Sequence, residues 1–249
     1  YLIMNKKLWE ASKAIKNKSN LFRYEKFLAQ NYNYNISQNY QKLLEWSIAK
    51  TNNFWSSIWD FTKVKGNKKN KFKYSKNLID SKFLMGSKLN FAENLLSKNN
   101  DSKAITFISE NGYRETRTWK QLNINTSKLI KLFEKLKIKK GDRIAAYLPN
   151  TIETVESFLA TASIGAIWSS CSPDFGANGV IERFSQIKPK LLIITDRYYY
   201  NGKEINVLER LSEILKKIKS IKNIILINYP GKDNLKIKKI KNINIILWK

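Results

Sequence analysis

The sequence contains no histidine and only one cysteine, Cys171, among its 249 residues. Without histidine it cannot form a Ser-His-Asp triad, an imidazole base or a histidine-ligated metal site. A single thiol also excludes an internal disulfide and a thiolate zinc site. We therefore predict no metal site within the chain, and we expect its chemistry to use carboxylates, lysine, hydroxyls, backbone groups or a bound cofactor.

Long apolar runs are also missing. A membrane-spanning helix needs about 20 consecutive apolar residues, whereas runs such as Ile224–Ile227 are soon interrupted by Asn or Lys. No signal peptide is apparent, so we expect a cytoplasmic protein without a membrane partner. The hydrophobic fraction of 43%, with 12% aromatic residues, excludes intrinsic disorder and predicts a substantial core.

Negative charge is scarce, because 20 acidic residues face 46 basic ones and leave a formal net charge of +26. Such an excess ordinarily raises nucleic acid as a partner. However, 39 of the basic residues are Lys and only seven are Arg, the residue favoured for specific base contacts. The excess also lies in Lys/Asn-rich segments such as 63–76 and 232–241, whereas residues 141–200 carry five basic and six acidic residues. We favour a solvated, compositionally biased surface over a nucleic-acid site.

The first part of the chain, to about residue 97, is predicted to be helical with irregular connections. Apolar residues within Tyr40–Phe61 recur at spacings of three and four, which indicates an amphipathic helix, and its three tryptophans suggest a face that docks on a neighbouring domain. The Lys63–Lys76 run has no apolar periodicity and is expected to be a solvated loop.

A different pattern follows. Ala104–Ser109 and Tyr113–Trp119 alternate as strands around Asn111-Gly112, a dipeptide that favours a type I′ hairpin turn. Beyond it, helices and short apolar strands alternate as in βαβ units, which predicts a mainly parallel sheet with its ligands bound beyond the carboxyl ends of the strands. The predicted helices are 120–136, 152–163, 178–187 and 207–218, and the predicted strands are 142–148, 165–170, 191–195 and 223–228. In the helix Ile152–Ser163, Glu153 and Glu156 are assigned to the polar face opposite the apolar one.

Two segments lie where such a sheet presents a site. Ser169–Gly176 is a polar turn with a structural Pro and Gly, and its Cys171 is expected to be a buried structural thiol because no histidine can activate it. Asp196–Lys203 contains three adjacent tyrosines, a glycine turn and two cations. It could bind a nucleotide phosphate, or it could be a loop whose aromatics pack under the domain edge; the residues alone leave both open.

Several motifs are spread over nearly all of residues 8–203. They are Leu8-Trp9-Glu10, Phe54-Trp55 with Ile58–Phe61, Leu89–Leu96, Gly165–Gly176, Arg183-Phe184, Gln186-Ile187, Pro189-Lys190 and Tyr200–Lys203. Together they resemble the acetoacetyl-CoA synthetases (acetoacetate–CoA ligases) of the acyl-adenylate-forming superfamily. The Ser-Pro-Asp-Phe-Gly element at 172–176 is the specific part, since acetyl-CoA synthetases differ there.

The resemblance implies an α/β fold. A helical N-terminal region (1–97, core about 40–97) would precede the first part of a mainly parallel αβαβα AMP-binding domain (98–249), with C-terminal truncation and Met4 as a natural start. It also implies a ligase that uses ATP, CoA and Mg²⁺ to convert acetoacetate to acetoacetyl-CoA through an acyl-adenylate. The family's phosphate loop, Y-x-S-G-x-T-G-x-P-K, does not occur in these residues. We therefore expect no catalytic residue within this chain and no activity from it alone.

One binding site can be carried over from the related acetyl-CoA synthetases, in which the corresponding loop holds cations near the phosphates of CoA. The matching positions are Tyr200, Asn201, Gly202 and Lys203; Lys203 keeps the charge, whereas Tyr200 replaces an arginine. The alternative functions are an acetyl- or propionyl-CoA synthetase and, from another class, a basic nucleic-acid-binding module. We expect small-molecule substrates and no nucleic-acid partner.

Overall fold

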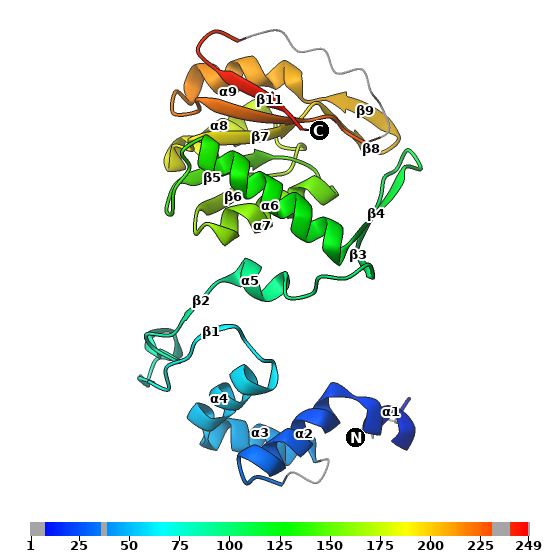
Figure 1. The fold of residues 1–249 in the computed structure, drawn as a ribbon, viewed down its shortest axis with the longest axis vertical. Coiled ribbons are helices and arrows are strands. Elements are labelled where there is room, and N and C mark those ends of the chain that lie inside the picture. Colours follow the sequence, from blue (N-terminus) through cyan, green and yellow to red (C-terminus); the bar gives the residue numbers. More distant parts are fainter. Residues whose placement is uncertain (1–7, 36–38, 231–239, 249) are drawn as a thin grey trace, which may run out of the picture. The chain divides into compact units, whose positions relative to one another are not determined.

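The computed structural model describes residues 8–35, 39–230 and 240–248. The chain divides into two compact units, Tyr1–Leu89 and Asn90–Lys249, which are considered separately (Figure 1). Most of the Lys/Asn-rich segment 232–241, which is predicted to be solvated, and the expected natural start at Met4 lie outside the described residues. Within the described residues, no helix combines the length and the apolar composition needed to cross a bilayer.

The first unit is mainly helical. Tyr24, Leu28, Leu43 and Trp46 form its buried centre, and the Trp46 ring stacks on Tyr34 with centroids 4.8 Å apart. Its elements are α1 (Lys13–Lys18), α2 (Asn20–Asn31), α3 (Tyr40–Ala49), α4 (Thr51–Phe61), the short antiparallel strands β1 (Gly66–Asn67) and β2 (Lys88–Leu89), and a 3₁₀ turn at Leu78–Asp80.

The predicted single helix over Tyr40–Phe61 is wrong, because the helix breaks at Lys50, whose φ of −122° and ψ of 48° are not helical. The break lets α3 fold back on α4, so that Trp46 packs edge-on against Phe54 within the same unit. Trp46, one of the three tryptophans expected on a docking face, is therefore buried inside its own unit. Periodicity did not reveal the break, because the apolar spacing continues across it.

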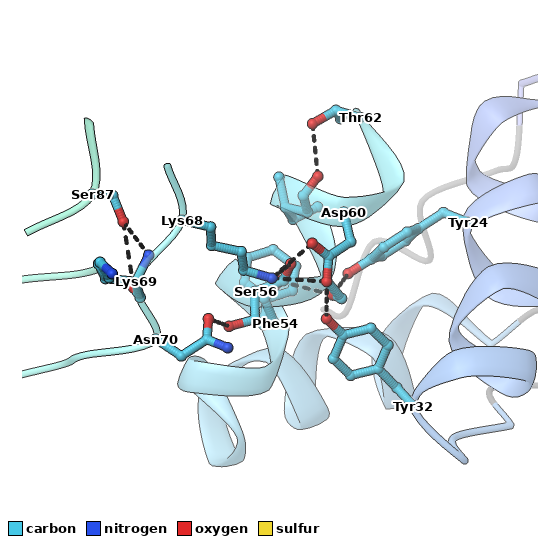
Figure 2. Close-up of polar contacts among 12 residues, drawn as sticks. Tyr24, Tyr32, Phe54, Ser56, Asp60, Thr62, Lys68, Lys69, Asn70 and Ser87 are labelled. Atoms are coloured by element: carbon cyan, nitrogen blue, oxygen red, sulfur yellow. Dashed lines mark hydrogen bonds and ion pairs between the residues drawn. The ribbon is translucent and has the colours of Figure 1, made fainter. Parts of the chain in front are cut away.

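The Lys63–Lys76 segment is only partly the solvated loop that its composition predicts. Figure 2 shows the Lys68 ammonium donating to both carboxylate oxygens of Asp60, at 2.7 Å each, and to the Ser56 carbonyl at 3.0 Å. The Tyr32 hydroxyl donates to the same carboxylate at 2.7 Å. Asn70 accepts a hydrogen bond from the Ser56 hydroxyl at 3.0 Å, so this part of the segment is fixed on α4.

The second unit is built on a five-stranded parallel sheet in the order β11-β10-β7-β5-β6, which confirms the α/β prediction. The strands are β5 (Arg143–Tyr147), β6 (Ile167–Cys171), β7 (Leu191–Thr195), β10 (Asn223–Ile227) and β11 (Asn244–Leu247), all close to their predicted positions except β11, which was not predicted. The central strands are buried on both faces, as their continuous apolar runs require.

Alternate residues of each strand pack on opposite layers of helices. One face, including Leu192 and Ile194, packs on α8 (Ala177–Ile187) and α9 (Leu211–Lys217). The other, including Leu191 and Ile193, packs on α6 (Trp119–Lys135) and α7 (Ile152–Ser163). A short helix, α5 (Phe91–Leu95), and a 3₁₀ turn at Leu208–Arg210 complete the helical elements of the described part of this unit.

Two antiparallel hairpins extend the unit (Figure 1): β3 (Lys103–Ile108) with β4 (Arg114–Thr118), and β8 (Arg197–Tyr200) with β9 (Lys203–Asn206). The predicted type I′ turn at Asn111-Gly112 is wrong, because only Gly112 of the pair has positive φ, at +83°. Gly112 N–H instead donates to the Ser109 carbonyl at 3.0 Å, as in a type I turn closed by a glycine bulge.

The type I′ geometry occurs at the second Asn-Gly pair. Asn201 and Gly202 both have positive φ, at +51° and +71°, and they join the paired residues Tyr200 and Lys203. The segment Asp196–Lys203 is therefore mostly a strand and a tight turn. The two-residue connection fixes the strand register here, whereas the longer first loop does not need two left-handed residues.

Candidate functional site

The carboxyl ends of the parallel strands lie along one edge of the sheet, where α/β proteins bind ligands. Ser172–Gly176 follows β6, Asp196 and the hairpin of β8 and β9 follow β7, and Asn228–Pro230 follow β10. Both segments singled out from the sequence therefore lie at this edge.

The Ser172–Gly176 turn is held by Arg210 and Tyr147. One nitrogen of the guanidinium, Nη1, donates to the Tyr147 hydroxyl at 2.6 Å and to the carbonyls of Pro173 and Phe175 at 2.7 and 3.2 Å. The Tyr147 hydroxyl donates to the Phe175 carbonyl at 2.5 Å. Burial raises the pKa of Tyr147, so it remains a protonated donor. The turn is thus fixed through its backbone, and its shape depends on two side chains remote in sequence.

Cys171 lies at the start of this turn and is 4% exposed. Burial raises the pKa of its thiol, which disfavours the reactive thiolate. The prediction of a buried thiol is confirmed.

The 197–206 hairpin, formed by β8, the Asn201-Gly202 turn and β9, is anchored at its base. Arg197 donates to Asp196 at 2.7 Å and to Glu204 at 3.1 Å. Asp196, 3% exposed, also accepts the Tyr229 backbone N–H at 2.7 Å, which ties the hairpin to the segment after β10. Arg197 is consequently engaged in holding the hairpin.

The four residues proposed from the sequence come together at the hairpin tip. Tyr200 is 60% exposed, and Asn201, Gly202 and Lys203 are exposed as well. The Gly202 N–H donates to Glu110 at 3.1 Å, which places a carboxylate from the other hairpin beside the turn. An anion at this tip would be attracted by Lys203 and repelled by Glu110.

A second polar cluster, which the sequence did not predict, lines a cavity of about 430 Å³. We call it the acidic cavity. Its walls come from β4, α6, α7 and the ends of β10 and β11, and its lining consists of Tyr113, Glu115, Arg117, Asn125, Lys128, Leu129, Leu132, Glu153, Ile225, Asn228, Tyr229, Pro230, Ile246, Leu247 and Trp248.

The assignment of Glu153 and Glu156 to a polar outer face is wrong. Glu153 is 7% exposed and Glu156 is fully buried, because α6 packs on α7 and the Arg117 side chain of β4 reaches over Glu156. Arg117 Nε donates to Glu156 Oε1 at 3.3 Å, and Asn125 Nδ2 donates to the same oxygen at 2.8 Å. The polar partners come from elsewhere in the chain, so no local spacing could have disclosed them.

Glu156 carries a strongly shifted pKa. Burial raises it from 4.5 to about 7, the donors Asn125 and Arg117 oppose the rise, and the neighbouring carboxylate of Glu153 adds to it. Arg117 is shared, since its Nη1 also pairs with Glu115. Three carboxylates therefore surround one guanidinium.

Neither cluster forms a metal centre. Within the described part of the chain, no group of three or more Cys, Asp or Glu side chains could hold a metal ion. The residues present do not fit the Mg²⁺ that the resemblance implies, and we derive no step through it.

The family of AMP-binding enzymes matches residues 92–243, more than half of the chain. The chain is 41% identical to "Acetoacetyl-CoA synthetase" of Xenopus tropicalis over 210 residues, and 35% identical to "Acetoacetyl-coenzyme A synthetase" of Rhizobium meliloti (strain 1021) over 212 residues. These matches cover 82% and 85% of this chain but only 31% and 32% of the relatives.

A solved structure, "Acetoacetyl-CoA Synthetase from Streptomyces lividans", superposes with a TM-score of 0.84 at 25% identity, and covers 95% of this chain and 36% of that one. The chain thus spans about a third of the length of the proteins that it matches. The parallel sheet, its helical layers and the extent of the match lead to one conclusion: this chain belongs to the family of AMP-binding enzymes.

Proposed function

We propose that the chain is part of an acetoacetate–CoA ligase. The observation that carries the proposal is the similarity to acetoacetyl-CoA synthetases of an animal and a bacterium across more than four fifths of the chain. The Ser-Pro-Asp-Phe-Gly element supports it, because it lies at the ligand edge of the sheet and is fixed by Arg210 and Tyr147.

The proposed reaction has two steps. The acetoacetate carboxylate attacks the α-phosphorus of ATP, the bond to the β-phosphate oxygen breaks, and pyrophosphate leaves. The CoA thiolate then attacks the carbonyl carbon of the adenylate and expels AMP. Both steps move charge among anions, so they require cationic stabilisation. In the proposal, Mg²⁺ accompanies ATP, and we assign no described residue to it or to either bond-making step.

For CoA, we propose contact at the tip of the 197–206 hairpin. The exposed Lys203 ammonium offers a point charge to a phosphate, and Tyr200 offers a ring face or a single hydroxyl. Tyr200 and Lys203 face one another across the turn as a cross-strand pair, so both can reach one ligand. Glu110 beside Gly202 weakens the attraction, and we expect a modest contribution to CoA affinity.

The test is an activity assay of the complete protein encoded by the gene. We expect pyrophosphate release to require ATP and acetoacetate, AMP release to require CoA as well, and acetoacetate to be used at least ten-fold faster than acetate or propionate. Faster turnover of acetate or propionate would replace the proposal by the alternative ligase, and no acid-dependent pyrophosphate release would reject a ligase altogether. We expect the protein to be cytoplasmic, which fractionation would test.

The nucleic-acid alternative has a separate test. Specific binding should survive moderate salt and depend on sequence, whereas binding through scattered lysines should vanish as salt rises. We expect any binding of nucleic acid to vanish as salt rises.

A further inference from the structure

The acidic cavity combines apolar and charged residues in its lining. Leu129, Leu132, Ile225 and Trp248 contribute apolar surface, Glu115 and Glu153 contribute carboxylates, and Arg117 and Lys128 contribute cations. Its volume of about 430 Å³ falls within the range of small-molecule sites. It is formed by β4, α6, α7, β10 and β11, and none of the four residues of the proposed CoA contact lines it.

The carboxylates of this region differ in how they are paired. Arg117 pairs with Glu115 and with Glu156. In the described part of the chain, no ion pair joins Glu153 to any cation, although Arg117 and the exposed Lys128 also line the cavity. The described lining thus holds two carboxylates and two cations, and Glu153 is the carboxylate that forms no ion pair.

Glu153 is the side chain that points to a ligand. It is 7% exposed, it lines the cavity, and its Oε2 is buried without a hydrogen-bond partner among the described residues. Burying a carboxylate oxygen without a hydrogen-bond partner costs free energy. A ligand group that brings both a positive charge and an N–H donor would recover that free energy.

We propose that the acidic cavity binds a small organic cation, a primary ammonium or guanidinium group on an apolar body. The head group donates to Glu153, while the body lies against Leu129, Leu132 and the ring of Trp248. The aromatic ring adds a favourable surface for the cation or for its body. A metal ion is the poorer candidate, because no group of side chains suited to one is present in the described residues.

The experiment uses the complete protein encoded by the gene and three probes of similar shape: 2-phenylethylamine, 2-phenylethanol and 3-phenylpropanoate. Isothermal titration should show saturable binding of the amine, at least ten-fold tighter than the alcohol, and no binding of the carboxylate. Tryptophan fluorescence should change in parallel, because Trp248 lines the cavity. Equal binding of the amine and the alcohol, tighter binding of the carboxylate, or no saturable binding would overturn the proposal.

Two variants localise the site. Glu153→Gln should weaken amine binding at least five-fold and leave alcohol binding unchanged, whereas Glu134→Gln, an exposed carboxylate on α6, should change neither. Near-ultraviolet circular dichroism checks that the variants fold. Leu132→Trp, which fills the apolar side, should reduce the binding of both probes. Unchanged amine affinity in Glu153→Gln or Leu132→Trp would place binding elsewhere and refute the assignment.

Discussion

Two places in the second unit gather charged side chains: the acidic cavity, with residues from β4, α6 and α7, and the tip of the 197–206 hairpin. In the cavity, Glu156 is fully buried and its pKa rises to about 7. At the tip, Lys203 is exposed and joins no ion pair within the described residues. Water screens a charge at the tip, whereas burial makes each charge in the cavity depend on its partners. We expect substitutions in the cavity to change stability and those at the tip to change mainly ligand affinity.

The largest effect should come from Arg117→Met. This change leaves Glu115 and the buried Glu156 without their shared cation, and breaking a buried pair costs about 3 kcal/mol or more. Urea unfolding would measure the loss. Arg114→Met on the same strand is the matched control, because Arg114 is exposed and should cost less than about 0.5 kcal/mol. Equal losses for both variants would show that burial does not distinguish the two arginines.

Glu156→Gln should give the next largest effect, and it should depend on pH. The folded-state pKa of Glu156 is raised from 4.5 to about 7, so the folded protein binds the proton more tightly than the unfolded chain. Ionisation therefore costs stability progressively between pH 4.5 and 7, to a total on the order of 3 kcal/mol. The variant should gain stability relative to the original chain across this window.

The measurement for Glu156→Gln is urea unfolding of both proteins at pH 5 and pH 8. The exposed Glu134→Gln serves as the control and should show no such trend. A stability difference that stays constant with pH would mean that Glu156 is ionised throughout.

A smaller effect is expected at the hairpin tip from Asn201→Ala. Alanine tolerates the φ of +51° poorly, so the cost should be about 1 kcal/mol, and Asn201→Gly should recover most of it. Asn111 does not have positive φ. At this position Asn111→Gly should therefore destabilise the protein more than Asn111→Ala. Thermal unfolding of the four variants tests whether the order reverses between the two Asn-Gly turns.

The smallest effect on stability should come from Lys203→Gln, which should leave the Tm unchanged. In the complete protein, the same change should raise the KM for CoA about three-fold, as expected for a screened surface charge. Glu110→Gln should lower that KM by removing the repulsion at Gly202. An unchanged KM in both variants would remove the hairpin tip from the proposed CoA site.

Much of the second unit could be predicted because its signals are local. The run Leu191–Thr195 is apolar throughout and forms β7 at the predicted positions, and the helix Ile152–Ser163 is found with its predicted ends. The candidate site was located only in part: the hairpin tip was predicted through its resemblance, but the acidic cavity was missed. Its charged members lie on β4, α6 and α7, and their grouping follows from packing.

The sequence by itself determined the βαβ alternation, the burial of Cys171 and the family resemblance, because each depends on residue types at short spacing. The tertiary structure decided what surrounds each side chain. It buried Glu153 and Glu156, gave the type I′ turn to Asn201-Gly202, and brought Arg210 onto the Ser172–Gly176 turn. The physical reason is that charge, burial and turn geometry depend on neighbours that only folding brings together.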